Sequence, residues 1–226
     1  MPKDRDIEAF HNRAADYERG WRGRMHRDIA LCTADIALTL NPAPRRVLDV
    51  GCGTGLLLRL LAEHLPESDQ LVGIDAAEAM IAVGRSMAND PRIRLSQGVA
   101  ESLPYPDQSF DVVVSTTSFD HWKDQDAGLA ECARVLVPSG HLVLTDLFSM
   151  WLAPTMLLGH RDRARTKRRA GALLTAAGFG SVTWHTLYRT IIGTAVAGRA
   201  GSVGIGEGPG NNEGRPGRAG SGEACV

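Results

Sequence analysis

The feature that most constrains the fold of this chain is a regular alternation of short apolar runs with helical stretches. Five apolar runs have the length and composition of buried strands, at 47–50, 71–75, 93–97, 110–116 and 141–146. The segments between them include three with the apolar spacing of helices, at 55–65, 77–89 and 124–136. Strands that alternate with helices form a parallel sheet covered by helices on both faces. The sequence therefore predicts an α/β fold.

The C-terminal part of this pattern differs from the rest. A helix is expected at about 162–177, where Gly178 provides a C-terminal stop. Two further apolar runs, 181–188 and 191–196, have no helix between them, so we expect them to pair antiparallel. The whole pattern predicts a Rossmann-like sheet of seven strands that is mostly parallel, with an antiparallel last strand and helices on both faces.

The chain divides into three parts. Residues 1–44 form an expected N-terminal helical cap, which Gly20 and Gly23 break into two helices. Residues 45–197 hold the alternating strands and helices. Residues 198–226 contain ten glycines and few apolar side chains, so we expect a disordered tail there.

The composition argues against several classes of protein. A formal net charge of -1 gives no overall attraction to nucleic acid or to anionic membranes, so we expect neither as a partner. The four cysteines form no CxxC pair and have no histidine at zinc spacing, which predicts reduced thiols and no metal site. The N-terminus lacks an apolar signal region, and no apolar run approaches the roughly 20 residues of a membrane span. These features favour a cytoplasmic protein.

The most informative segment is VLDVGCGTG at 47–55, in which a buried strand leads into a glycine-rich turn and then a helix. Gly51, Gly53 and Gly55 allow a sharp turn and a close approach of the backbone to a ligand at the carboxyl edge of the sheet. Their GxGxG spacing differs from the GxGxxG of dinucleotide dehydrogenases and from the phosphate-binding GxxxxGK[ST] loop. Asp49 stands two residues before the turn, which disfavours a pyrophosphate ligand and suits a cationic one.

Asp75 is the second acidic marker, because it ends the second strand 20 residues after Gly55. A carboxylate at this place can accept hydrogen bonds from both hydroxyls of a ribose. The alternative is that Asp75 is the N-cap of the helix at 77–89.

Four segments together resemble the class I S-adenosylmethionine (SAM) dependent methyltransferases, particularly the type 11 small-molecule group. These segments are VLDVGCGTG, GID, GVAESLPYPDQSFDVVVS and ARVLVPSGHLVLTD, and the resemblance extends over about 45–196. It implies a seven-stranded sheet, SAM as the cofactor, and a SAM-binding methyltransferase domain at 45–197.

The resemblance also implies roles for individual residues. It places the three glycines near the methionyl and ribose parts of SAM, Asp49 behind the methionyl amino group, Asp75 at the ribose, and the adenine beside Ala76 and Met80. The sequence departs from the family at Gly98-Val99-Ala100, because the family has an aspartate at the middle position that accepts from the adenine amino group. Ala100 can still donate through its backbone, and Glu101 is a candidate substitute acceptor. Ser115, at the end of the fourth strand, completes the expected cofactor-binding set.

The loop at 115–122 lies at the ligand edge of the sheet and lacks the [DNS]PP[YF] motif of enzymes that methylate nucleobase amines. His121 in this loop is the candidate general base, since an unperturbed imidazole titrates near pH 6.5. The alternative is that His121 caps the helix at 124–136 or packs, with Trp122 in the core. The same alternative applies to Asp120.

Apolar side chains are expected to overhang the strand ends. The segment at 147–160 is unusually apolar for a connection and forms either a pocket lining or an ordinary packed helix. The side chains expected around the cleft are Tyr17, Trp21, Phe119, Trp122, Phe148, Met150, Trp151 and Met156. Apolar walls with a few polar groups favour an apolar or aromatic substrate.

These observations predict a SAM-dependent methyltransferase that acts on a small molecule through a hydroxyl or similar acceptor, without a metal. A non-catalytic SAM-binding subunit remains an alternative, and it would bind SAM without methylating anything. An RNA methyltransferase is a further alternative and should show a basic face and an RNA-binding domain. The oligomeric state stays open.

Overall fold

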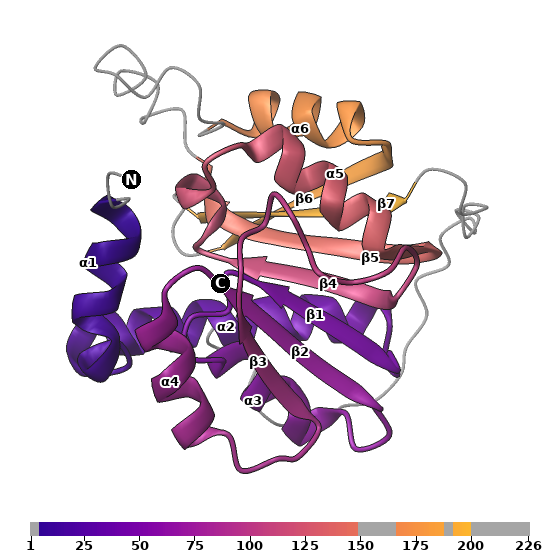
Figure 1. The fold of residues 1–226 in the computed structure, drawn as a ribbon. Coiled ribbons are helices and arrows are strands. Elements are labelled where there is room, and N and C mark those ends of the chain that lie inside the picture. Colours follow the sequence, from indigo (N-terminus) through magenta and orange to yellow (C-terminus); the bar gives the residue numbers. More distant parts are fainter. Residues whose placement is uncertain (1–4, 149–165, 188–191, 200–226) are drawn as a thin grey trace, which may run out of the picture.

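The computed structural model describes residues 5–148, 166–187 and 192–199 (Figure 1). Its centre is a seven-stranded sheet in the order β3-β2-β1-β4-β5-β7-β6. The strands are β1 Arg46–Val50, β2 Gln70–Asp75, β3 Ile93–Gln97, β4 Phe110–Thr116, β5 Leu136–Leu147, β6 Phe179–Leu187 and β7 Ile192–Arg199. Strands β1 to β5 pair parallel, whereas β7 pairs antiparallel with both β5 and β6. The predicted Rossmann-like sheet is thus confirmed.

Helices cover both faces of the sheet (Figure 1). They are α1 Arg5–Arg13, α2 Gly20–Leu40, α3 Leu56–His64, α4 Glu78–Met87, α5 Gln125–Val135 and α6 Lys167–Ala176, with short 3-10 helices η1 Ala14–Asp16 and η2 Phe119–His121. Helices α2, α3 and α4 pack in one apolar cluster, and α5 and α6 pack in another on the opposite face. Along β1, Val47 belongs to the first cluster and Leu48 to the second, because successive side chains of a strand point to opposite faces.

Two boundaries differ from the prediction. Gly23 does not break the N-terminal helix but lies inside α2, which begins at Gly20. A Cβ at Gly23 would lie 2.1 Å from the backbone of Glu18, so this glycine permits close packing. The strand expected at 141 begins at Leu136, because Leu136 already pairs with Phe110 across a local irregularity in the register.

Some expectations fall outside the described residues. Most of the apolar segment at 147–160 and of the predicted tail lie there, although β7 includes the first two tail residues, 198–199. Cys52 and Cys132 are free buried thiols, but Cys32 is disulfide-bonded, so the expectation of reduced thiols is wrong at Cys32. Within the described ranges, no helix has both the length and the apolarity to cross a membrane.

Candidate functional site

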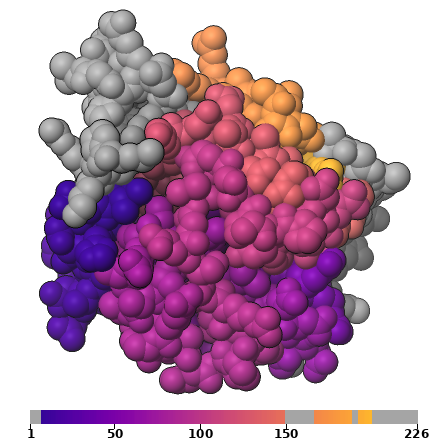
Figure 2. Space-filling model, viewed as in Figure 1, coloured from indigo at the N-terminus to yellow at the C-terminus, as the bar shows by residue number. Residues whose placement is uncertain are grey.

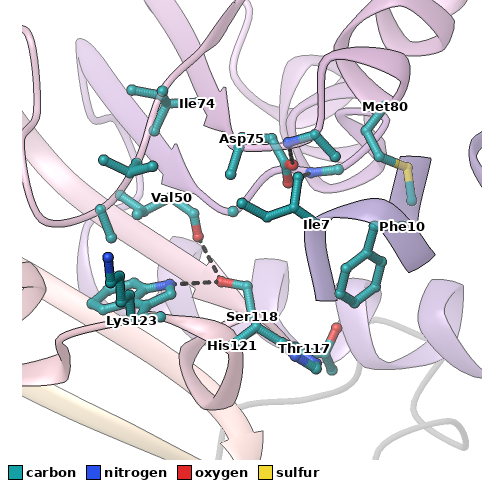
Figure 3. A pocket seen from close by; sticks show the side chains of 18 of the residues that line it. Ile7, Phe10, Val50, Ile74, Asp75, Met80, Thr117, Ser118, His121 and Lys123 are labelled. Carbon is teal, nitrogen blue, oxygen red and sulfur yellow. Dashed lines mark hydrogen bonds between the residues drawn. The ribbon is translucent and has the colours of Figure 1, made fainter. Parts of the chain in front are cut away.

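A cavity of about 350 Å³ lies at the carboxyl edge of β1, β2 and β4 (Figure 3). The N-terminal segment adds Ile7, Phe10 and Tyr17 to its lining, and α1 packs against α4 at one end of the molecule (Figure 2). Of the predicted site residues, those that line it are Gly51, Gly53, Asp75, Ala76, Met80, Ala100, Glu101 and His121. Asp49, Gly55 and Ser115 lie outside its lining.

The glycine-rich turn has the backbone conformation that its composition suggests. Gly51, Gly53 and Gly55 all have positive φ angles, of 76°, 53° and 74°, a region that glycine alone enters without steric cost. The amides of Gly51 and Cys52 donate to the carbonyl of Ile74, at 2.8 and 3.1 Å. A Cβ at Gly51 would lie 2.1 Å from Ser118 Oγ, so the turn also packs closely against the loop after β4.

Asp75 connects the end of β2 to this turn. Its Oδ2 accepts from the amide of Gly53 and its Oδ1 from the amide of Ala77, both at 2.8 Å. Ala77 is itself the N-cap residue of α4, and no side chain caps this helix, so the capping alternative for Asp75 is wrong. Burial raises the pKa of Asp75, and the two amide hydrogen bonds oppose that shift. Each carboxylate oxygen can accept a further hydrogen bond from a ligand.

Asp49 lies buried beneath the glycine turn. Its Oδ1 has no hydrogen-bond partner among the residues that the structure describes. Burial, followed by the nearby Asp75 carboxylate, raises the pKa of Asp49 to about 8. A buried carboxylate oxygen without a donor is costly, and a cation or a donor group nearby would relieve that cost. The site therefore suits a ligand that brings positive charge to the turn.

Val99, where the sequence departs from the family pattern, lies in the lining of the cavity together with Met80 and Ala100. Met80 and Ala100 are buried apolar wall residues, while Val99 remains 43% exposed. Glu101 accepts from the amide of Asp124 at 3.0 Å, so one of its oxygens already positions the start of α5. Its role as a substitute adenine acceptor stays a prediction.

The loop after β4 contains a polar residue that sequence reasoning missed. Ser118 Oγ donates to the carbonyl of Val50 at 3.0 Å and accepts from the indole of Trp122 at 3.2 Å (Figure 3). Ser115 is fully buried, and its Oγ lies 2.9 Å from Ser118 Oγ. Ser118, rather than Ser115, thus lines the cavity. The sequence feature that could have indicated Ser118 is the short loop rich in serine and threonine at the carboxyl end of β4.

His121 belongs to η2 and faces the cavity. Its exposed ring packs edge-on against Phe10 of α1, with centroids 4.9 Å apart. It does not cap α5, because the side chain of Asp124 does so by accepting from the amide of Ala127. The capping alternative is therefore wrong, whereas the contact with Phe10 agrees with the packing alternative, and Trp122 lies in the core.

Asp146 is the second-last residue of β5 and lies close to His121. The carboxylate accepts from the amide of Asp120 at 3.2 Å and thereby connects β5 to η2. Burial raises the pKa of Asp146 to about 6, and the neighbouring His121 opposes this shift. Sequence reasoning did not single out Asp146, although it ends an expected strand at the ligand edge.

The expected apolar surroundings are only partly present. Tyr17 and Trp122 line the cavity, and Trp122 also packs in the core with Phe119 and Phe148. The side chain of Trp21 is 64% exposed and lies outside this cavity. Met150, Trp151 and Met156 are outside the described residues.

The N-terminal segment is held over the glycine turn by an ionic contact. Glu18 accepts from Arg59 at 2.6 Å and from the hydroxyl of Thr54, which lies in the turn. The adjacent Tyr17 lies against Gly53, with its ring carbon 3.7 Å from where a Cβ would stand. Burial, followed by the charge of Asp75, raises the pKa of Tyr17 to about 12. These contacts therefore hold the N-terminal segment against the glycine turn.

Comparisons with known proteins agree with this geometry. Residues 48–144 match the Methyltransf_11 family, described as a methyltransferase domain. The demethylmenaquinone methyltransferase of Deinococcus radiodurans is 40% identical over 57% of this chain and 50% of that protein. The malonyl-[acyl-carrier protein] O-methyltransferase of Methylococcus capsulatus is 32% identical over 63% of this chain and 54% of that protein.

Solved structures share the fold. The YcgJ protein of Bacillus subtilis superposes with a TM-score of 0.60 and 20% identity, covering 76% of this chain and all of that one. The chain spans about half the length of the curated relatives it matches, so a relative's substrate does not transfer directly. The match over residues 48–144 is to a methyltransferase domain, for which the implied methyl donor is SAM.

Proposed function

We propose that this chain transfers a methyl group from SAM to a small apolar or aromatic molecule with a hydroxyl or similar acceptor. One observation carries the proposal. A single cavity brings the glycine turn and Asp75 together with the imidazole of His121. The proposed cofactor-binding groups and the candidate base thus face the same cavity, as alignment of donor and acceptor requires.

The cofactor side is assigned from the groups that remain available. When bound, SAM supplies an electrophilic methyl group on a cationic sulfur. Asp75 can accept from the ribose hydroxyls, because each of its oxygens makes only one hydrogen bond in the structure. The unpartnered oxygen of Asp49 beneath the turn favours a positively charged group there. Met80 and Phe10 offer apolar surface for the adenine.

The acceptor side requires only modest chemistry. In this proposal His121 accepts the proton of an acceptor hydroxyl, which makes the oxygen more nucleophilic. If the hydroxyl is attached to an aromatic ring, removal of its proton also raises the electron density on the ring carbons next to the oxygen. A base at this place therefore supports methylation of either oxygen or carbon, and the two relatives named above include a quinone enzyme and an O-methyltransferase.

Calorimetry tests the cofactor part of the proposal. The purified chain should bind SAM and S-adenosylhomocysteine and should not bind NAD, because the turn lacks the dinucleotide spacing. Binding of NAD, or no binding of SAM, would contradict it.

Turnover tests the acceptor part. Incubation with methyl-labelled SAM should label phenols or hydroquinones but not their fully O-methylated counterparts, which lack the acidic proton. Amines and carboxylic acids complete the panel. If the chain binds SAM and labels nothing, with or without cell extract, a non-catalytic SAM-binding subunit is the better description.

A further inference from the structure

A second cavity, of about 220 Å³, lies beside the first and shares Tyr17 with it. We call it the basic hollow and define it by Arg13, Tyr17, Gly20, Trp21, Arg22 and His26, together with the ion pair of Asp16 and Arg19. The ring of Tyr17 stacks on the imidazole of His26, with centroids 4.9 Å apart and planes at 24°. The same tyrosine lies against Gly53 on the cofactor side, so one aromatic side chain borders both spaces.

The walls of the basic hollow carry excess positive charge. Arg13 and Arg22 have no carboxylate partner among the described residues, whereas the single aspartate of the wall, Asp16, is paired with Arg19 at 2.8 Å. Burial, then the charges of Arg13 and Arg22, lower the pKa of His26. Both guanidinium groups therefore act on the same imidazole, at the place where the hollow meets Tyr17.

The shape of the basic hollow leaves room for a planar group. Gly20 has a φ of 65°, and a Cβ built there meets no atom within 4 Å, so its backbone borders open space. The largely exposed ring of Trp21 stands beside it, with the guanidinium of Arg22 5.5 Å from the ring centroid. Guanidinium groups bind planar oxyanions in a fork geometry, and an indole face holds apolar groups.

We propose that the basic hollow binds the oxyanion, a carboxylate or a phosphate, of an apolar acidic molecule that is the methyl acceptor. Arg22 and Arg13 contact the oxyanion, Trp21 contacts the adjoining apolar part, and the reactive end extends past Tyr17 toward His121. Oxyanion binding stands on the hollow alone, whereas its role in choosing the acceptor rests on the proposed function.

A binding experiment tests whether the basic hollow binds an oxyanion. In the full chain saturated with S-adenosylhomocysteine, the NMR signals of His26 are followed during titration with benzoate, phenyl phosphate or benzyl alcohol. The two anions should give saturable shifts and raise the pKa of His26, because they offset the arginine charges, whereas the neutral alcohol should not. Arg22→Gln should weaken anion binding on the order of tenfold. Arg24→Gln, an exposed arginine of α2 outside the hollow, should leave it unchanged.

Two results would contradict oxyanion binding in the basic hollow. One is the lack of a saturable response at His26. The other is an equal loss in Arg22→Gln and Arg24→Gln, which would show only general attraction to a basic surface. Comparison of benzoate with phenyl phosphate then distinguishes a carboxylate site from a phosphate site.

Kinetic measurements test whether the basic hollow selects the methyl acceptor, with hydroxylated aromatic acids and their methyl esters as acceptors. Arg22→Gln should raise KM for the acids on the order of tenfold and leave KM for the esters, kcat and S-adenosylhomocysteine affinity unchanged. A loss of S-adenosylhomocysteine affinity instead would assign the hollow to the cofactor and overturn the proposal. If no acceptor is methylated by the unmodified chain while benzoate still binds at His26, the proposed function fails and the oxyanion site stands.

Discussion

The two sides of the cavity, which we propose bind the cofactor and the acceptor, are built in different ways. On the cofactor side, the key bonds join neighbouring strand ends through the backbone, as between Gly53 and Asp75 or Gly51 and Ile74. On the acceptor side, His121 packs on Phe10 of α1, and its turn is bonded to Asp146 of β5. The first geometry follows from one short motif and the adjacent strand. The second depends on three distant segments coming together.

The largest expected effect breaks the cofactor side at one backbone position. Gly53→Val should abolish detectable SAM binding by calorimetry, because a branched side chain at φ 53° strains the turn and enters the cavity. Gly178→Val provides a matched control, since Gly178 has a φ of 89° and no atom within 4 Å of a built Cβ. The control should lose stability but keep SAM binding. Normal binding by Gly53→Val would show that Gly53 does not face the cofactor.

The acceptor side should respond in turnover and not in cofactor affinity. His121→Ala should lower kcat roughly 10²–10⁴-fold if the imidazole removes the acceptor proton. SAM affinity should change little, since Asp75 and the glycine turn are left intact. His185→Ala on the exposed face of β6 serves as the control and should keep full activity. A His121→Ala enzyme with normal turnover would assign this residue to packing against Phe10.

Substitution of Asp49 should affect the stability of the protein and its affinity for SAM in opposite directions. Its folded pKa of about 8 lies above the ordinary value of 3.8, so the native state holds the proton more tightly. Native stability therefore falls as pH rises from about 4 to about 8. Asp49→Asn should remove this loss and stabilise the ligand-free protein by roughly 1–3 kcal/mol at pH 8.5, with little gain at pH 4.5.

Urea unfolding at the two pH values measures this effect, and calorimetry should show weaker SAM binding by the same variant. A variant that is less stable than the unmodified chain at pH 8.5 would contradict the assignment of a buried, unpartnered carboxylate.

The smallest expected effect is at Val99, beside the proposed adenine site. Val99→Asp should tighten SAM binding about threefold to tenfold by restoring an acceptor that the family carries, in line with about 1 kcal/mol for one hydrogen bond. Val99→Leu keeps an apolar side chain and should give no gain. Equal affinities in all three proteins would indicate that Glu101 already satisfies the adenine amino group.

The sequence by itself determined the elements of the fold and the centre of the cofactor side. Strand and helix follow from hydrophobic periodicity, a local property, and the left-handed angles at Gly51, Gly53 and Gly55 follow from the residue type. The same holds for Asp75, whose place at a strand end brings it beside the glycine turn in any parallel sheet of this kind.

Only the tertiary structure decided which side chains face the cavity. Phe119 and Trp122 are three residues apart and both pack in the core, yet only the second also lines the cavity. Gly23 looked like a helix break, but its role depends on where Glu18 packs. Ser118, Asp146 and the placement of Trp21 in the basic hollow likewise depend on contacts between distant segments. Local propensity carries no information about such contacts, because close packing of the whole chain sets them.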